Sequence, residues 1–178
     1  MNKVQPDLIL LELEDEHFTK DFKLNTVKYS LEEFLNGNEN IAGYKYQQQN
    51  GTLLRPFDIN GRHEFYQKEK YHGQENKMFG EMLNIYKDNR FSENCKADFE
   101  ILLSALSSYS ELSFSSLKEA NSDVATKFYA LKNKINFELM ISIIKRTKEL
   151  EKWLRFAELI KDYWNRRNQV MAENIIKY

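Results

Sequence analysis

Glycine and proline are scarce in this chain, and their scarcity limits the folds that it can adopt. Only 6 glycines and 2 prolines occur in 178 residues. Because these two residues mark most turns, a chain with so few of them must run through long elements, mostly helices. Hydrophobic residues make up 42% of the sequence, which is enough apolar surface for a packed core. We therefore expect one folded, largely helical domain.

Two short segments near the start predict β-strands. The run "DLILLEL", residues 7–13, is nearly continuous in apolar residues, as in a strand buried on both faces of a parallel sheet. "TLLRPFDI", residues 52–59, predicts a second strand, and Pro56 places it at an edge or bends it. Between them, residues 30–37 carry a capping box typical of a short helix. Residues 39–51 predict a second helix that ends at an Asn-Gly pair.

After the second strand, the pattern is helical to the end. Apolar residues recur at steps of three and four through residues 63–178, with weak points at Gly73 and Gly80 and a break near Asn121. The sequence thus predicts a predominantly helical α/β fold, with a β-α-α-β part in residues 1–62 and a long helical part. Two strands do not form an independent sheet unless helices cover them. We expect a small, partly incomplete parallel sheet, as in a fragment of a larger domain.

Charge and composition exclude several classes of protein. The chain holds 26 basic and 27 acidic residues, with a net charge of −1, so no basic excess attracts nucleic acid or an anionic membrane. A signal peptide and a membrane-spanning run of ~20 apolar residues are both absent from the sequence. We expect a cytoplasmic protein without nucleic-acid or membrane partners. A small-molecule substrate, a protein partner and a homo-oligomer all stay open.

An arginine interrupts the apolar stripe of the last predicted helix. Arg167 lies three residues after Trp164 and four before Met171. The other positions on this face are Leu150, Trp153, Ala157, Ile160 and Ile175. Because an unpaired buried guanidinium is very costly, Arg167 needs a buried anion. Glu12 and Asp58 are its natural partners, since each lies at the carboxyl end of a predicted strand and ligands gather beyond the carboxyl ends of parallel strands.

Each of these three residues also has an ordinary structural interpretation. Glu12 could accept hydrogen bonds in the turn that follows its strand. Asp58 precedes Asn-Gly and fits an Asx-type turn. Arg167 could bury its stem and extend its charged head into water. The three histidines lack metal-ligand spacing such as HExxH, so spacing does not support a divalent metal, although Glu12 could serve as a ligand.

Three segments resemble a superfamily of hydrolases. "RNQVMAENI", residues 167–175, is similar to the R-D-x-x-M-A-x-N helix of erythromycin esterase-like proteins. "PDLILLELEDE", residues 6–16, resembles the P-D-x-x-x-x-E-L-D strand of the TraB-type (pheromone-shutdown) and Tiki-type proteins. "RPFDINGR", residues 55–62, is similar to the G-F-D-I strand of the esterase branch. The matches cover about 30 of 178 residues, in the order that the family has.

The resemblance implies an α/β core with a large helical insertion. It also implies an active site that joins a strand-end glutamate, a helix arginine and histidines. On this basis Glu12 matches a general base or metal ligand, and Arg167 matches the residue that binds an anionic group or orients the glutamate. Asp58 matches the acid of the second strand. Asn168 departs from the family's aspartate at that position.

The larger departure concerns the histidine segments. The family's G-E-x-x-H segment precedes the glutamate strand, and nothing like it precedes Lys3. A second histidine segment follows the family's arginine helix, whereas this sequence stops at Tyr178. We therefore expect a truncated or degenerate esterase-like or metal-dependent hydrolase-like domain, inactive alone. The alternative is a non-catalytic helical protein-interaction module.

Overall fold

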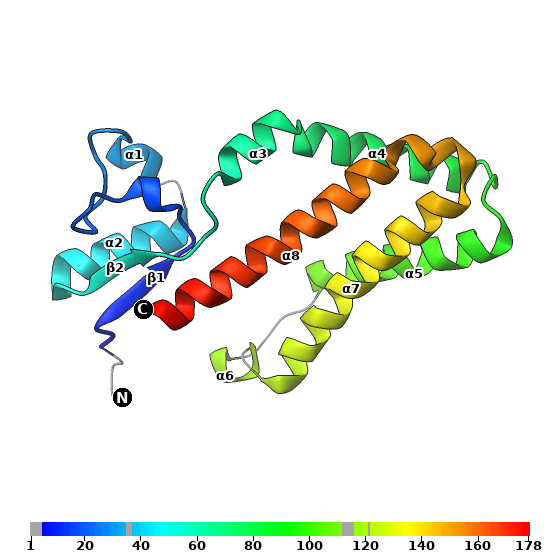
Figure 1. Cartoon of the computed structure of the whole chain (residues 1–178). Coiled ribbons are helices and arrows are strands. Elements are labelled where there is room, and N and C mark those ends of the chain that lie inside the picture. Colours follow the sequence, from blue (N-terminus) through cyan, green and yellow to red (C-terminus); the bar gives the residue numbers. More distant parts are fainter. Residues whose placement is uncertain (1–4, 35–36, 112–115, 121) are drawn as a thin grey trace. The chain divides into compact units, whose positions relative to one another are not determined.

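The computed structural model describes residues 5–34, 37–111, 116–120 and 122–178. It shows the expected fold class, a predominantly helical α/β protein with a small parallel sheet (Figure 1). The chain forms two compact units. Unit 1 comprises Met1–Glu69 and Tyr163–Tyr178, and unit 2 comprises Lys70–Asp162. The last helix, α8 (Leu154–Lys177), contributes residues to both units.

The two predicted strands form the sheet of unit 1. β1 (Leu8–Leu11) and β2 (Leu53–Pro56) pair in parallel, each shorter than its predicted segment. The expectation that β1 is buried on both faces is wrong, because only its last residue is buried. The reason is its alternation. Odd-numbered side chains of this segment join a core on one face, whereas the even-numbered ones do not. This core consists of Leu11, Leu13, Phe18 and Leu54, with Ile9 packed against it.

Three short helices connect the strands: η1 (Asp15–His17), α1 (Leu31–Phe34) and α2 (Asn38–Asn50). α2 lies against the sheet at Gly43, where a Cβ atom would lie 2.9 Å from a methyl group of Leu11. A larger residue at this position would therefore push α2 away from the sheet. The predicted end of α2 is confirmed, since Gly51 adopts the left-handed conformation with φ of 71°.

Unit 1 also contains the segment that follows β2 and the C-terminal part of α8. Gly61, with φ of 78°, turns the chain into α3 (Arg62–Lys68). The rings of Phe65 on α3 and Tyr163 on α8 stack with centroids 3.8 Å apart. Farther along α8, the Asn174 amide donates a hydrogen bond to the Phe57 carbonyl at 3.3 Å. The C-terminal part of α8 is therefore held to both α3 and the end of β2.

The described residues of unit 2 form helices and the turns between them, without a strand. Its elements are α4 (Tyr71–Lys87), α5 (Glu93–Glu111), α6 (Leu117–Ala120), α7 (Asp123–Arg146), η2 (Lys148–Trp153) and the start of α8. α5 and α7 lie side by side (Figure 1). Side chains from these helices form an apolar core that includes Met78, Met82, Phe99, Leu102, Met140, Ile143, Ile144, Phe156 and Ile160.

The helix breaks in unit 2 agree only in part with the sequence pattern. The chain does not break at Gly73 or Gly80, which both lie inside α4; it breaks at Lys70, where φ is 47°. The break expected near Asn121 is present, although Asn121 itself lies outside the described residues. The Ser122 hydroxyl caps α7 by accepting a hydrogen bond from the backbone N–H of Ala125.

Candidate functional site

Arg167 is buried on α8 and pairs with both expected carboxylates. Its side chain is only 7% exposed. Nε donates to Asp58 Oδ1 at 2.7 Å, and Nη2 donates to Asp58 Oδ2 at 3.1 Å and to Glu12 Oε1 at 2.5 Å. The guanidinium thus grips Asp58 with two parallel hydrogen bonds, the strong geometry for an arginine–carboxylate pair. The structure places Arg167 in this pairing rather than with its head in water.

Asp58 is the enclosed centre of the arrangement. Its side chain has no exposed surface, and Asp58 lies two residues after Pro56, where β2 ends. Besides the two bonds from Arg167, Oδ1 accepts the backbone N–H of Ile59 at 2.8 Å, and Oδ2 lies 2.7 Å from Nη1 of Arg62. Asp58 therefore combines two ion pairs with a bond from the backbone of the next residue, which is not the bond to the second residue on that defines an Asx turn.

Arg62 is the member that the sequence analysis did not assign to the site. It is the first residue of α3, and its Nη1 also lies 3.3 Å from Glu12 Oε1. Two acids and two bases form one network, here called the arginine cluster: Glu12, Asp58, Arg62 and Arg167. Glu12 is 48% exposed, so the cluster meets solvent at Glu12. The signal for Arg62 was its spacing of four residues from Asp58.

The protonation of Arg167 follows from its surroundings. Burial by itself would lower the pKa of Arg167, but hydrogen bonding and attraction from Asp58, followed by those from Glu12, outweigh it, and the net pKa is raised above its ordinary value. Arg167 therefore stays cationic at any physiological pH. It can stabilise negative charge, but it cannot exchange a proton with a substrate.

Glu14 fixes the start of α3, and the sequence analysis missed this role. It is 2% exposed, and its carboxylate accepts the backbone N–H groups of Gly61 at 2.7 Å, Arg62 at 3.2 Å and His63 at 3.4 Å. A negative charge at these N–H groups also complements the positive end of the helix. Glu14 thereby positions Arg62 for the cluster. Its contact across 47 residues has no local sequence signal.

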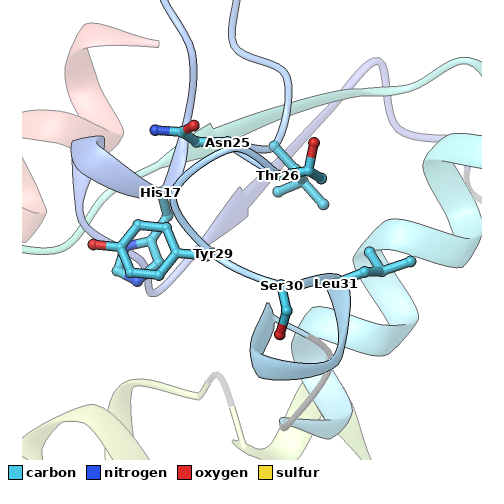
Figure 2. Close-up of a pocket in the computed structure, with 7 residues that line it drawn as sticks. His17, Asn25, Thr26, Tyr29, Ser30 and Leu31 are labelled. Carbon is cyan, nitrogen blue, oxygen red and sulfur yellow. The ribbon is translucent and has the colours of Figure 1, made fainter.

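Among the described residues of unit 1, hollows also lie outside the cluster. One, of about 260 Å³, is lined mostly by acids: Glu14, Asp15, Glu16, Asn60, Gly61 and Glu64. The described residues contain no group of three or more His, Cys, Asp or Glu side chains that could hold a metal ion. Another hollow, drawn in Figure 2, lies beside His17 and Tyr29, whose rings stack at 4.5 Å. Its free volume is about 10 Å³, roughly enough for one water molecule.

Histidine takes no part in the cluster within the described part of the chain. The hydrogen bonds and ion pairs of Glu12, Asp58 and Arg167 there involve carboxylates, guanidinium groups and backbone only. The ring of His63 lies one helical turn from Gln67, with its Nε2 2.7 Å from the Gln67 amide nitrogen. The structure thus brings the three predicted site residues together, while their catalytic roles stay predictions.

No family model, curated protein or solved structure matches this chain. The relationship to erythromycin esterase-like and TraB-type proteins therefore rests on the three quoted segments and stays a prediction. Among the residues that the structure describes, no helix is long and apolar enough to cross a bilayer.

Proposed function

We propose that the chain is a degenerate hydrolase-like domain resembling the erythromycin esterase and TraB-type superfamily, with the arginine cluster at the position of the active site. The observation that carries the proposal is the pairing of buried Arg167 with Asp58 and Glu12, which lie 109 and 155 residues away in the chain. These are the strand-end acids and the helix arginine that the resemblance singles out. A buried arginine at the carboxyl ends of two parallel strands occupies the usual position of a ligand site in an α/β sheet.

The chemistry of the cluster favours binding over turnover. Glu12 is the half-exposed acid, so it is the one that a substrate or water can reach, and a glutamate can act as a general base. The guanidinium of Arg62, whose side chain is 27% exposed, could stabilise an oxyanion that develops nearby. However, Oε1 of Glu12 already accepts hydrogen bonds from two guanidinium groups, so this oxygen is occupied by protein groups. Since no histidine contacts the cluster within the described residues, we expect the domain to bind small esters without hydrolysing them.

A double-mutant cycle tests the cluster itself. Arg167→Met keeps the stem and removes the charge, and Glu12→Gln removes the partner's charge. We expect a coupling free energy of more than ~1 kcal/mol, since residues in one ion-pair network rarely act additively. The matched control pairs Arg167→Met with Glu64→Gln, an exposed acid on α3, whose effect should add to that of Arg167→Met. Simple additivity in both cycles would remove the basis of the proposal.

Titration with p-nitrophenyl butyrate, a small chromogenic ester, tests the function. We expect NMR amide shifts next to Glu12, Arg62 and Arg167, lost in Glu12→Gln, and hydrolysis no faster than in buffer. Shifts confined to other surfaces, or none, would overturn the proposal. Hydrolysis above the buffer rate that Glu12→Gln abolishes would keep the hydrolase and reject its degeneracy. Hydrolysis that survives Glu12→Gln would place the activity outside the cluster.

The second candidate is a non-catalytic helical interaction module, and the sheet edges favour it. Hydrogen bonds from the backbone N–H groups of Leu53 and Phe57 run to β1, so the backbone groups of Leu54 and Pro56 face the outer edge of β2. Pro56 has no N–H group, and the Arg55 guanidinium covers the Leu54 carbonyl at 2.8 Å. This edge is therefore blocked, as natural proteins block edges against unwanted pairing.

The opposite edge, on β1, has no such protection. Within the described residues, β1 pairs with β2 alone, and by the same alternation the N–H group of Leu10 points away from β2. On this second candidate, β1 contacts another chain through this edge. Sedimentation velocity should then show a complex or dimer that Leu10→Pro disrupts, whereas Leu10→Val should leave it intact. A monomer at all concentrations, without a partner, would count against this candidate.

A further inference from the structure

We propose that Asn60 is a deamidation site, and that its conversion to aspartate or isoaspartate opens the start of α3 and releases Arg62 from the arginine cluster. Asn60 is exposed, and Gly61 follows it in the turn between Asp58 and Arg62. Asparagine is chemically labile, most of all before glycine, whose backbone nitrogen no side chain shields. This modification does not depend on the hydrolase function proposed above.

The reaction needs only water. The backbone nitrogen of Gly61 bonds to Cγ of Asn60, the bond from Cγ to Nδ2 breaks, and ammonia leaves with the proton of the Gly61 N–H group. Water then opens the resulting succinimide ring at either of its carbonyl groups, which gives aspartate or isoaspartate. The hollow of about 260 Å³ that Asn60 and Gly61 help to line lets water reach this ring.

The fold itself requires this reactive pair. Gly61 adopts the left-handed conformation, with φ of 78°, which a residue with a side chain would adopt only under strain. The Asn60 amide binds Asp15 at two points: Oδ1 accepts the backbone N–H of Asp15 at 2.9 Å, and Nδ2 donates to Asp15 Oδ2 at 2.9 Å. An aspartate at position 60 could not make the second bond. The turn into α3 is therefore best made by an asparagine followed by a glycine.

The same contacts hold the reaction back in the folded chain. Ring formation turns the Asn60 amide away from Asp15 and takes the Gly61 N–H group away from Glu14 Oε2, to which it donates at 2.7 Å. The Glu14 carboxylate also opposes loss of the proton from this nitrogen, because the nitrogen then becomes negatively charged. The start of α3 must therefore open before Asn60 reacts, and the deamidation rate should follow the population of the open form.

The product would keep the start of α3 open. A carboxylate at position 60 would set an oxygen against Asp15 Oδ2 in place of the Nδ2 donor, and two carboxylates at this distance repel each other. Isoaspartate carries the main chain through its side-chain carbon, which lengthens the backbone before Gly61 and moves the Gly61 N–H group from Glu14. Either product thus weakens the bonds by which Glu14 positions Arg62 for the cluster.

The surroundings of Asn60 would not neutralise the new charge. The lysine and the arginine beside it already have carboxylate partners, since Lys28 pairs with Glu16 and Arg62 pairs with Asp58. A carboxylate at position 60 would join the acids that line the same hollow: Glu14, Asp15, Glu16 and Glu64.

Peptide mapping by mass spectrometry tests the proposal. The full chain is incubated at mildly alkaline pH, and deamidation is followed separately at each Asn-Gly pair. Asn50 is the internal reference, because it is exposed like Asn60 but the N–H group of Gly51 donates to the carbonyl of Gln47 at 2.8 Å rather than to a carboxylate. We expect Glu14→Gln to speed deamidation of Asn60 at least about fivefold and to leave the rate at Asn50 unchanged.

Two further variants separate the Glu14 bond from charge in general. Glu64→Gln removes an acid from the same hollow and leaves the bond from Gly61 to Glu14 in place, so the rate at Asn60 should change less than about twofold. Asp15→Ala frees the Asn60 amide by a change at an exposed residue. This variant should fold, which circular dichroism checks, and it should speed deamidation of Asn60 as Glu14→Gln does.

The variant Asn60→Asp tests the consequence of the reaction. Amide hydrogen exchange at Gly61, Arg62 and His63 should become at least about fivefold faster than in the wild type. The control is Asn50→Asp, which adds the same charge at another exposed position and should leave this exchange unchanged.

Release of Arg62 is measured by a double-mutant cycle. In the wild-type background the effects of Arg62→Met and Glu12→Gln on unfolding should be coupled, since the two side chains are in contact. In the Asn60→Asp background the same two effects should become additive.

Several results would overturn the proposal. These are equal acceleration by Glu14→Gln and Glu64→Gln, an Asn60 that stays intact in Glu14→Gln and Asp15→Ala while Asn50 reacts, or unchanged exchange and coupling in Asn60→Asp. None of these results bears on ester binding by the wild type, so this proposal and the proposed function fail separately.

Discussion

The inner face of α8 buries hydrocarbon in unit 2 and an ion cluster in unit 1. In unit 2 this face presents Phe156, Ala157 and Ile160 to an apolar core. In unit 1 the same stripe, seven residues farther on, presents Arg167 to Asp58. Burial of hydrocarbon is favourable roughly in proportion to area and needs no particular partner. Burial of a guanidinium is tolerated only with matching carboxylates. The same face of α8 therefore buries apolar side chains in unit 2 and an ion pair in unit 1. These two kinds of buried contact should respond differently to substitution.

The largest expected effect is the loss of the buried charge. Arg167→Met should lower the free energy of unfolding by about 3–5 kcal/mol, because it removes one partner of a buried pair and leaves Asp58 with fewer cationic donors. The matched control is Arg146→Met. Arg146 pairs with Asp98 at the surface, with a side chain 39% exposed, and its loss should cost less than ~1 kcal/mol. Urea unfolding measures both. Equal losses of unfolding free energy in Arg167→Met and Arg146→Met would mean that burial does not increase the contribution of the Arg167 ion pairs to stability.

The next effect is a cavity on the apolar part of the same face. Ile160 is 1% exposed, and Ile160→Ala should cost about 2–5 kcal/mol. Ile160→Leu, which conserves volume, should cost less than ~1.5 kcal/mol. Arg167→Lys, although it conserves charge, should cost more than Ile160→Leu, because an ammonium group cannot reproduce the two parallel bonds to Asp58. Urea unfolding measures these costs. If Ile160→Leu cost more than Arg167→Lys, side-chain shape at Ile160 would matter more to stability than the two parallel bonds of Arg167.

Local patterns predicted most of the elements of both units. Hydrophobic periodicity and capping residues, which act over a few positions, predicted the strands, their parallel pairing, the end of α2 at Gly51 and a break near Asn121. The two glycines of α4 were expected to be weak points, and they do not interrupt the helix. Gly73 and Gly80 each cost the helix only ~1 kcal/mol relative to alanine, and the helix continues through both.

The sequence predicted three of the four residues of the cluster, for a reason that applies beyond this chain. A charge on an apolar stripe requires an opposite charge, and strand ends gather side chains from distant segments, so Glu12 and Asp58 could be proposed as partners of Arg167. The double contact of Arg62 and the capping by Glu14 depend on the direction in which α3 leaves β2. That direction is a property of the folded chain. The spacing of four residues suggests the Asp58–Arg62 pair, but it does not predict the contact of Arg62 with Glu12 or the cap by Glu14.

A smaller effect should follow from the loss of the Glu14 cap. Glu14→Gln keeps one acceptor but removes the charge at the start of α3, and it should cost about 1–2 kcal/mol, in the range of helix-cap losses. Amide hydrogen exchange of Gly61, Arg62 and His63 should become faster than in the wild type. Glu64→Gln, an exposed change on the same helix, should stay within ~0.5 kcal/mol. Unchanged exchange in Glu14→Gln would mean that α3 starts without this carboxylate.

The smallest effect concerns Tyr163, which lies one turn before Arg167. Within the described residues its hydroxyl oxygen is buried without a hydrogen-bond partner, while its ring stacks on Phe65. Tyr163→Phe keeps the ring and removes the unpaired group, so it should be neutral or stabilise the protein by up to ~1 kcal/mol near neutral pH. Urea unfolding measures this difference. A loss of more than ~1 kcal/mol would mean that the hydroxyl group has a partner that stabilises the fold.

Alkaline titration sharpens this last prediction. Burial, with a smaller contribution from Tyr66, raises the pKa of Tyr163 from its ordinary 10.0 to about 12, against the pull of nearby Arg167. The folded state therefore holds the phenol proton more tightly than the unfolded chain does. The stability that this proton contributes is complete below pH ~10 and is lost as the pH rises through about 12. Tyr163→Phe has no such loss, so its advantage over the wild type should grow across this window. The prediction would fail if the stability difference between Tyr163→Phe and the wild type stayed constant across this window, and if tyrosinate absorbance showed that every tyrosine ionises near pH ~10. That result would mean that water reaches the hydroxyl group of Tyr163. Tyr163 would then belong to neither the apolar nor the ion-paired interior that α8 covers.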